Sequence, residues 1–125
     1  MLLVPNNQLA TAKARKLLPE IIPHQDAVLN SSRTALLVHA LAERPDLLFI
    51  ATEDLLHQKY RAQAMPKTIA LVEKLRGAGL AAVVSGAGPS VMVLYSGAED
   101  EIDQLESVAP GFTAMKLAIA KTGAQ

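Results

Sequence analysis

A loop of small residues between two valine-rich segments constrains the fold of this chain most. The loop is Ser85-Gly86-Ala87-Gly88-Pro89-Ser90, and the flanking segments are residues 81–84 and 91–95. Both segments have the length and β-branched content of strands, so they predict two strands joined by a tight connection. The loop itself has two interpretations. It is either a turn that reverses the chain, or a concavity whose backbone N–H groups bind an anion, because glycine lets a ligand approach the backbone.

The remaining elements follow from apolar spacing and from the positions of proline and glycine. We expect the helix over 26–42 to be buried on more than one side, because apolar residues surround most of it. Asn30 and Arg33 form a polar strip on that helix and are expected to bond to loop backbone, or else to border a site. The other predicted helices cover 9–18, 47–56, 66–76 and 99–109, and the other predicted strands cover 2–4 and 112–119.

This order of elements, with its tight turns, predicts an α+β fold. We expect a two-layer sandwich in which a four-stranded antiparallel, ferredoxin-like sheet carries its helices on one face. A chain of 125 residues is a common size for one domain. Residues 1–120 are expected to fold and 121–125 to form a polar tail.

Composition excludes several classes of partner. Twelve basic and twelve acidic side chains cancel, and only two Phe and two Tyr are present, which argues against a nucleic-acid surface. No apolar run reaches the roughly 18 to 20 residues that span a bilayer, so no membrane association is expected. The absence of cysteine fits a reducing compartment, and we predict a cytoplasmic location.

The motifs of several catalytic chemistries are missing from this sequence. It has no HExxH, no cysteine cluster and no paired histidines, so we expect no metal site built by this chain alone. It has no Walker A motif and no GxGxxG. His57 has no nucleophile in its segment, so acyl transfer has no support.

What remains is a set of cations that could hold an acidic ligand near the loop. Thr11 and Arg15 are four residues apart and would share one face of the first helix, as would His57 and Arg61 if their segment is helical. Arginine binds carboxylates through two parallel hydrogen bonds. The alternatives are that Arg15 is a solvated surface cation and that 57–61 is the rim of an amphipathic helix.

Three motifs in order resemble a known family. Thr-Ala-Lys-Ala-Arg-Lys-Leu-Leu-Pro at 11–19, His-Gln-Lys-Tyr-Arg at 57–61 and Val-Ser-Gly-Ala-Gly-Pro-Ser at 84–90 resemble the carboxy-terminal half of the homoserine kinases, which belong to the GHMP kinase superfamily. The glycine loop alone is typical of the superfamily, and the other two motifs narrow the resemblance to homoserine kinases. The similarity extends from about residue 3 to residue 119.

The resemblance implies a specific chemistry. Homoserine kinases transfer the γ-phosphoryl group of ATP to the hydroxyl of L-homoserine, with Mg²⁺, on the route to threonine. By resemblance, the homoserine pocket would be lined by Thr11, Arg15, Arg61 and the backbone of Gly86, and the two arginines would clamp the carboxylate. The residues packed beside the nucleotide phosphate loop would be Ser85, Gly86, Ala87, Gly88 and Ser90.

This sequence departs from the family by lacking its amino-terminal half. The phosphate loop P-x-x-x-G-L-G-S-S and the Mg²⁺-coordinating groups of the family are not in it. Phosphoryl transfer depends on positioned phosphates and metal, so we expect no catalytic residue, no ATP or Mg²⁺ binding and almost no kinase activity in this chain alone. Its partners would be L-homoserine and the missing amino-terminal kinase domain.

Two other functions compete with this interpretation. One is a non-catalytic α+β module that binds an amino acid or an anion and has a regulatory role. The other is a structural oligomerisation domain, in which the arginines would lie apart in solvent. We also expect self-association into a homo-oligomer, because a domain separated from its other half exposes apolar surface, and the edge of the first strand is a candidate contact.

Overall fold

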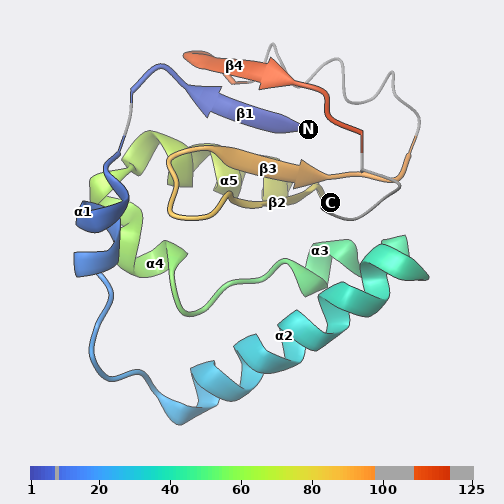
Figure 1. Cartoon of the computed structure of the whole chain (residues 1–125). Coiled ribbons are helices and arrows are strands. Elements are labelled where there is room, and N and C mark those ends of the chain that lie inside the picture. Colours follow the sequence, from blue (N-terminus) through green and yellow to red (C-terminus); the bar gives the residue numbers. More distant parts are fainter. Residues whose placement is uncertain (8, 98–108, 119–125) are drawn as a thin grey trace, which may run out of the picture.

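The strands of this chain form one antiparallel sheet with helices packed against it (Figure 1). The computed structural model describes residues 1–7, 9–97 and 109–118. Within them the elements are β1 (Leu2–Pro5), α1 (Thr11–Lys16), α2 (His24–Ala42), the 3₁₀ turn η1 (Pro45–Leu47), α3 (Leu48–Ala51), α4 (Gln58–Arg61), the 3₁₀ turn η2 (Ala62–Ala64), α5 (Pro66–Gly77), β2 (Ala81–Val84), β3 (Val91–Leu94) and β4 (Phe112–Met115). The predicted α+β fold with four antiparallel strands is confirmed.

The first strand lies inside the sheet. The strand order is β2-β3-β1-β4, and Leu2 lies opposite Met92 of β3 on one side and Met115 of β4 on the other. Because both edges of β1 are paired, the self-association expected through the edge of this strand is excluded. β2 and β3 are paired from Ala81–Leu94 to Val84–Val91, so the glycine loop joins the two strands of a hairpin.

Every second side chain of the strands points toward α5 and forms the main core. Leu3, Val91 and Val93 are fully buried there. Burying a side chain of this size stabilises a fold by about 1.5–3 kcal/mol. The complete buried cluster is Leu3, Met65, Leu71, Val72, Leu75, Ala82, Val84, Val91, Val93 and Ala109. It includes the stripe of leucine and valine that spacing predicts for α5.

The alternate side chains of β2 and β3 point the other way and contact a second helical layer. Ala81 and Leu94 lie directly opposite each other, next to Ala82 and Val93 of the main core, so they belong to the opposite face. They pack with Leu36, Leu37, Ala40, Leu47, Leu48 and Ala51. The helix α5 covers one face of the sheet, as expected. In addition, α2 and α3 form a smaller layer against the opposite face, at β2 and β3.

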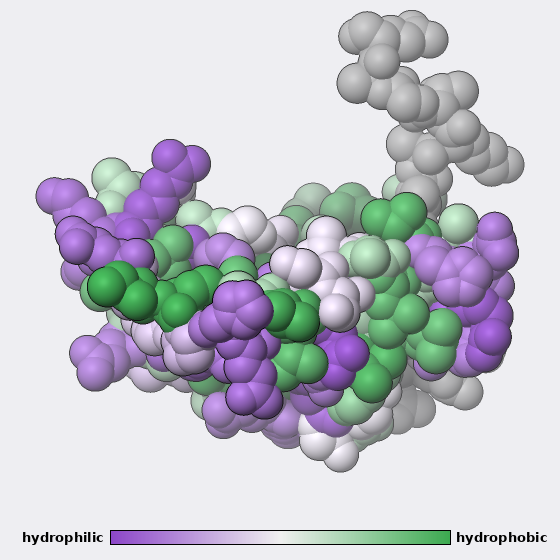
Figure 2. All heavy atoms as spheres, turned by 90° about the horizontal axis from the view of Figure 1, so that it is seen from below, coloured by the Kyte–Doolittle hydropathy of each residue, from purple (hydrophilic) through white to green (hydrophobic). Residues whose placement is uncertain are grey.

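The prediction that α2 is buried on more than one side is wrong. Its buried residue is Ala40, whereas Val28, Val38 and Leu41 are 50%, 69% and 48% exposed. The helix lies at the margin of the described part of the molecule, which it contacts along one side (Figure 1). Figure 2 shows the molecule from below, the side on which α2 lies in Figure 1, and apolar side chains gather on this face. Of the described helices, none combines the length and apolar character needed to cross a membrane.

The helix predicted over 47–56 is shorter in the structure, because α3 has four residues. The Thr52 hydroxyl donates to the Leu48 carbonyl (2.9 Å), which is a contact that weakens helix continuation. The N–H of Leu55 then donates to the Asn30 side-chain oxygen (3.0 Å) instead of a helical carbonyl. Side chains therefore satisfy this backbone where a helix was expected.

Other boundaries also differ from the expectation. The helix expected over 9–18 is the six-residue α1, and the strand expected over 112–119 ends at Met115. Residues 99–108 of the predicted last helix and the predicted tail, 121–125, lie outside the described residues.

Candidate functional site

Arg61, the last residue of α4, is buried although it carries a charge. Only 6% of its surface is exposed. Its Nη1 donates to the Gly86 carbonyl (3.1 Å), while its Nε has no hydrogen-bond partner. A buried charge without full pairing is unfavourable. The site is therefore chemically incomplete in a way that an anion would complete.

The Nε side of a guanidinium is suited to binding a carboxylate. A guanidinium presents Nε and the neighbouring Nη2 as a pair of parallel donors, whose spacing matches the two oxygens of a carboxylate. The bond to Gly86 uses the other nitrogen, Nη1. One side of Arg61 thus supports the glycine loop, while Nε on the other side is buried without a hydrogen-bond partner.

A cavity of about 290 Å³ lies beside Arg61. This volume is at the lower limit of ligand pockets and suits a molecule of amino-acid size. The cavity is lined by Asp54, His57, Gln58, Arg61, Val83, Val84 and Gly86.

Asp54, three residues before His57, stabilises the start of α4. Its carboxylate accepts hydrogen bonds from the backbone N–H groups of Leu56 (3.1 Å), His57 (3.1 Å) and Gln58 (2.6 Å), and it contacts His57 Nδ1 at 2.9 Å. A carboxylate at a helix start also interacts favourably with the helix dipole. Because these bonds occupy both of its oxygens, we interpret Asp54 as a structural part of the site.

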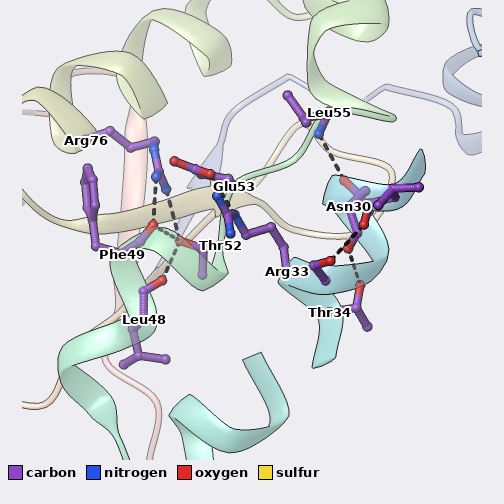
Figure 3. Close-up of polar contacts among 11 residues, drawn as sticks. Asn30, Arg33, Thr34, Leu48, Phe49, Thr52, Glu53, Leu55 and Arg76 are labelled. Atoms are coloured by element: carbon purple, nitrogen blue, oxygen red, sulfur yellow. Dashed lines mark hydrogen bonds and ion pairs between the residues drawn. The ribbon is translucent and has the colours of Figure 1, made fainter. Parts of the chain in front are cut away.

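Side chains of α2 fix the segment that precedes α4 (Figure 3). Asn30 accepts the hydrogen bond from the Leu55 N–H, and Arg33 forms an ion pair with Glu53 (Nε–Oε2, 2.8 Å). The expectation that Asn30 bonds to loop backbone is confirmed, and Arg33 reaches the same loop through a side chain. α2 therefore helps to position α4.

The glycine loop reverses the chain, as its first interpretation predicts. Ser85 N–H donates to the Ser90 carbonyl (2.8 Å) and Gly88 N–H donates to the Ser85 carbonyl (3.0 Å). Gly86 and Gly88 have φ values of +58° and +82°, which favour glycine. Toward Arg61 the loop presents a carbonyl, so the anion-binding role of its N–H groups stays a prediction.

Of the residues expected in the pocket, Arg61 and Gly86 are in contact, whereas Thr11 and Arg15 lie elsewhere. Both residues are exposed on α1, whose buried side chain is Ala14. Neither residue lines the cavity beside Arg61. In Figure 1, α1 lies at the same end of the molecule as α4 and the glycine loop.

A larger cavity, of about 460 Å³, lies between the end of β1 and the start of α5. Its Lys67 is exposed, and the hydroxyl of its Thr68 already donates to the Pro89 carbonyl (2.7 Å). This cavity therefore lacks the feature that distinguishes the smaller one, a buried charged group with an unpartnered donor.

Sequence reasoning missed the supporting roles of Asp54, Gln58 and Thr68. Gln58 accepts the Val84 N–H (2.8 Å) and so joins α4 to the strand that enters the loop. For Asp54 a signal was present, because an acidic residue shortly before a helix start is a frequent cap. No local pattern could pair Gln58 or Thr68 with residues more than twenty positions away.

Comparison with known proteins identifies the family of this chain. Residues 32–110 match the family described as GHMP kinases C terminal. The chain belongs to the GHMP kinase C-terminal family. The resemblance of the glycine loop to this superfamily is thereby confirmed.

Curated relatives of this GHMP kinase domain are homoserine kinases. It is 52% identical to the homoserine kinase of Streptomyces coelicolor over 97% of this chain and 39% of the relative. It is 59% identical to that of Leifsonia xyli subsp. xyli over 77% of this chain and 30% of the relative. The chain thus spans well under half the length of the curated relatives it matches.

A solved structure shares the fold of this domain. The crystal structure of homoserine kinase from Cytophaga hutchinsonii superimposes with a TM-score of 0.73 at 22% identity, over 90% of this chain and 38% of that chain. At this level of identity the match establishes the fold.

Proposed function

We propose that this chain is the homoserine-binding domain of a homoserine kinase, which phosphorylates L-homoserine with ATP. The observation that carries the proposal is the buried Arg61, whose Nε lacks a partner beside a cavity of amino-acid size. The names of the relatives support it, since they align over nearly the whole chain. The α-amino acid carboxylate of homoserine is the anion that would pair with Arg61.

The proposal assigns roles to the predicted residues. Arg61 receives the carboxylate. Roles for Thr11 and Arg15 of α1 in the same pocket stay a prediction, because neither residue lines the cavity beside Arg61. The backbone of Gly86 lines the pocket. The rest of the loop contacts the region that binds the nucleotide phosphates, through Ser85, Ala87, Gly88 and Ser90.

The groups that bind ATP and Mg²⁺ are proposed to lie on an amino-terminal kinase domain outside this sequence. In the part of the chain that the structure describes, no three His, Asp or Glu side chains gather as a metal site requires. The proposal assigns no catalytic residue to this chain and treats residues 1–125 as one carboxy-terminal domain. We infer a cytoplasmic location from the biosynthetic substrate and from the absence of cysteine.

Ligand binding tests the proposal directly. Calorimetric titration with L-homoserine should show binding, and L-homoserinamide, which replaces the carboxylate by a neutral amide, should bind at least about tenfold more weakly. Arg61→Met should lose homoserine affinity by a similar factor, and the exposed Arg44→Met is the matched control. Equal binding of acid and amide, or no effect of Arg61→Met, would contradict the proposal.

A phosphoryl-transfer assay tests where the catalytic groups lie. With ATP, Mg²⁺ and homoserine, this chain alone should give no turnover. A rate in the range typical of kinases, about 1–100 s⁻¹, would show that the chain contains its own catalytic groups.

A further inference from the structure

Thr68, in the first turn of α5, uses its hydroxyl to hold the glycine loop. The residue is 2% exposed, and its Oγ1 donates to the Pro89 carbonyl at 2.7 Å. A threonine hydroxyl near a helix start usually bonds to the backbone of its own helix. Here it bonds to a segment 21 residues further along the chain.

The Pro89 carbonyl needs this donor because Pro89 is buried. A buried carbonyl without a donor is unfavourable, and proline has no N–H of its own with which to stabilise the turn. Gly86 and Gly88, earlier in the loop, have positive φ values of +58° and +82°. Glycine backbone rearranges at low steric cost, so contacts from outside must select one loop conformation.

Three side chains supply those contacts at successive points of the loop. Gln58 accepts the Val84 N–H (2.8 Å) at the entry, Arg61 donates to the Gly86 carbonyl (3.1 Å) near the middle, and Thr68 bonds to Pro89 at the exit. The contact of Arg61 is also the one that orients its guanidinium. Loss of the Thr68–Pro89 bond would therefore change the orientation of the Arg61 guanidinium.

We propose that Thr68 is a positioning residue for carboxylate recognition: its bond to Pro89 fixes the loop so that Gly86 holds Arg61 Nη1 and leaves Nε and Nη2 to the ligand. The inference rests on the proposed function of Arg61 as the carboxylate-binding group. Thr68 itself does not touch the ligand in this arrangement.

Nuclear magnetic resonance of the 125-residue chain tests the proposal. Thr68→Val removes the hydroxyl and keeps the shape, whereas Thr68→Ser keeps the hydroxyl. In the ligand-free protein, Thr68→Val should displace the Gly86 amide and Arg61 Nε–Hε signals, and Thr68→Ser should leave them near their wild-type positions. Titration with L-homoserine should show about fivefold weaker binding for Thr68→Val and wild-type binding for Thr68→Ser, since one hydrogen bond is lost.

Controls separate this role from general destabilisation. Thr113→Val changes an exposed threonine of β4 and should alter neither the signals nor the affinity. If Thr68→Val does not fold, Thr68→Ala gives the same comparison. Unchanged Gly86 and Arg61 signals together with wild-type affinity in a hydroxyl-free variant would overturn the proposal. If the wild-type chain does not bind homoserine, the proposed function fails, while the ligand-free spectra still decide whether Thr68 positions Arg61.

Discussion

Arg76 of α5 stacks over the ring of Phe49, with 4.4 Å between the guanidinium carbon and the ring centroid, and donates to the Phe49 carbonyl at 2.8 Å (Figure 3). The same guanidinium donates to Thr52 Oγ1 (3.0 Å) and to the Ala82 carbonyl (3.2 Å). One side chain thus links α3, α5 and β2. Burial lowers the pKa of this guanidinium from its ordinary value, but the three acceptors keep its donors occupied.

We predict that Arg76→Met destabilises the chain by about 1–3 kcal/mol, because three acceptors lose their donor while the aliphatic stem is retained. Urea denaturation followed by circular dichroism measures the change. Arg44→Met breaks an exposed ion pair and should lower the urea midpoint much less than Arg76→Met does. A midpoint for Arg76→Met equal to that of wild type would show that these bonds add nothing.

The Arg44–Asp46 pair predicts a loss of stability in acid. Asp46 accepts two hydrogen bonds from Arg44, at 2.9 and 2.7 Å, and this contact lowers the pKa of the carboxyl below its ordinary 3.8. A carboxyl with a lowered folded-state pKa stabilises the fold above its unfolded pKa and loses that contribution as pH falls through the folded value. Wild type should therefore melt above Asp46→Asn at pH 7.

That difference in melting temperature should shrink as the pH falls below 3.8 and vanish below the lowered folded-state pKa of Asp46, where both chains are neutral at position 46. Thermal melts between pH 7 and pH 2 give the comparison. Added salt at neutral pH should also narrow the difference, since the pair is exposed. A difference in melting temperature between wild type and Asp46→Asn that grows in acid would contradict the prediction that ionised Asp46 stabilises the fold.

Gly88→Ala should destabilise the loop more than Gly86→Ala. Both glycines have positive φ, so each substitution adds left-handed strain of about 1–2 kcal/mol. A Cβ at Gly88 would also lie 2.6 Å from Sδ of the buried Met65, whereas a Cβ at Gly86 meets nothing within 4 Å. Crowding a packed site costs about 1–3 kcal/mol more. Equal unfolding free energies for the two variants would contradict this packing argument.

The exposed apolar face of α2 predicts self-association (Figure 2). Val28, Val38 and Leu41 are all about half exposed or more, and contiguous apolar surface seeks partners. Light scattering should give an apparent mass that rises with concentration, and Val38→Glu should reduce the rise. Leu117→Glu, at an exposed site beyond β4, is the matched control. A constant monomer mass over a wide concentration range would exclude this association.

The sequence was most informative where one local pattern had one physical solution. The helix α5 follows from a proline at its start and an apolar stripe along one side, and both features are found in the structure. The hairpin around the glycine loop likewise follows from two valine-rich segments and a short connection. Arg61 could be selected as a candidate because the resemblance and its chemistry agreed.

The remaining features depend on contacts between distant residues. Apolar composition predicted a buried α2, but burial depends on what packs against the helix, and the described residues pack against one side of it. The segment after α3 is not helical, because Asn30 and Asp54 accept hydrogen bonds from its backbone N–H groups. Such pairings are tertiary and override local propensity.

The order of the strands has a consequence for how the molecule is made. β1 fills the gap between β3 and β4, and its Leu2 is paired with Met115. Once β1 has been synthesised, it therefore stays without its last neighbour until β4, far along the chain, has been made. Contacts of such long sequence separation slow folding. Until then, the same strand is the segment that a chaperone would need to shield from other nascent chains.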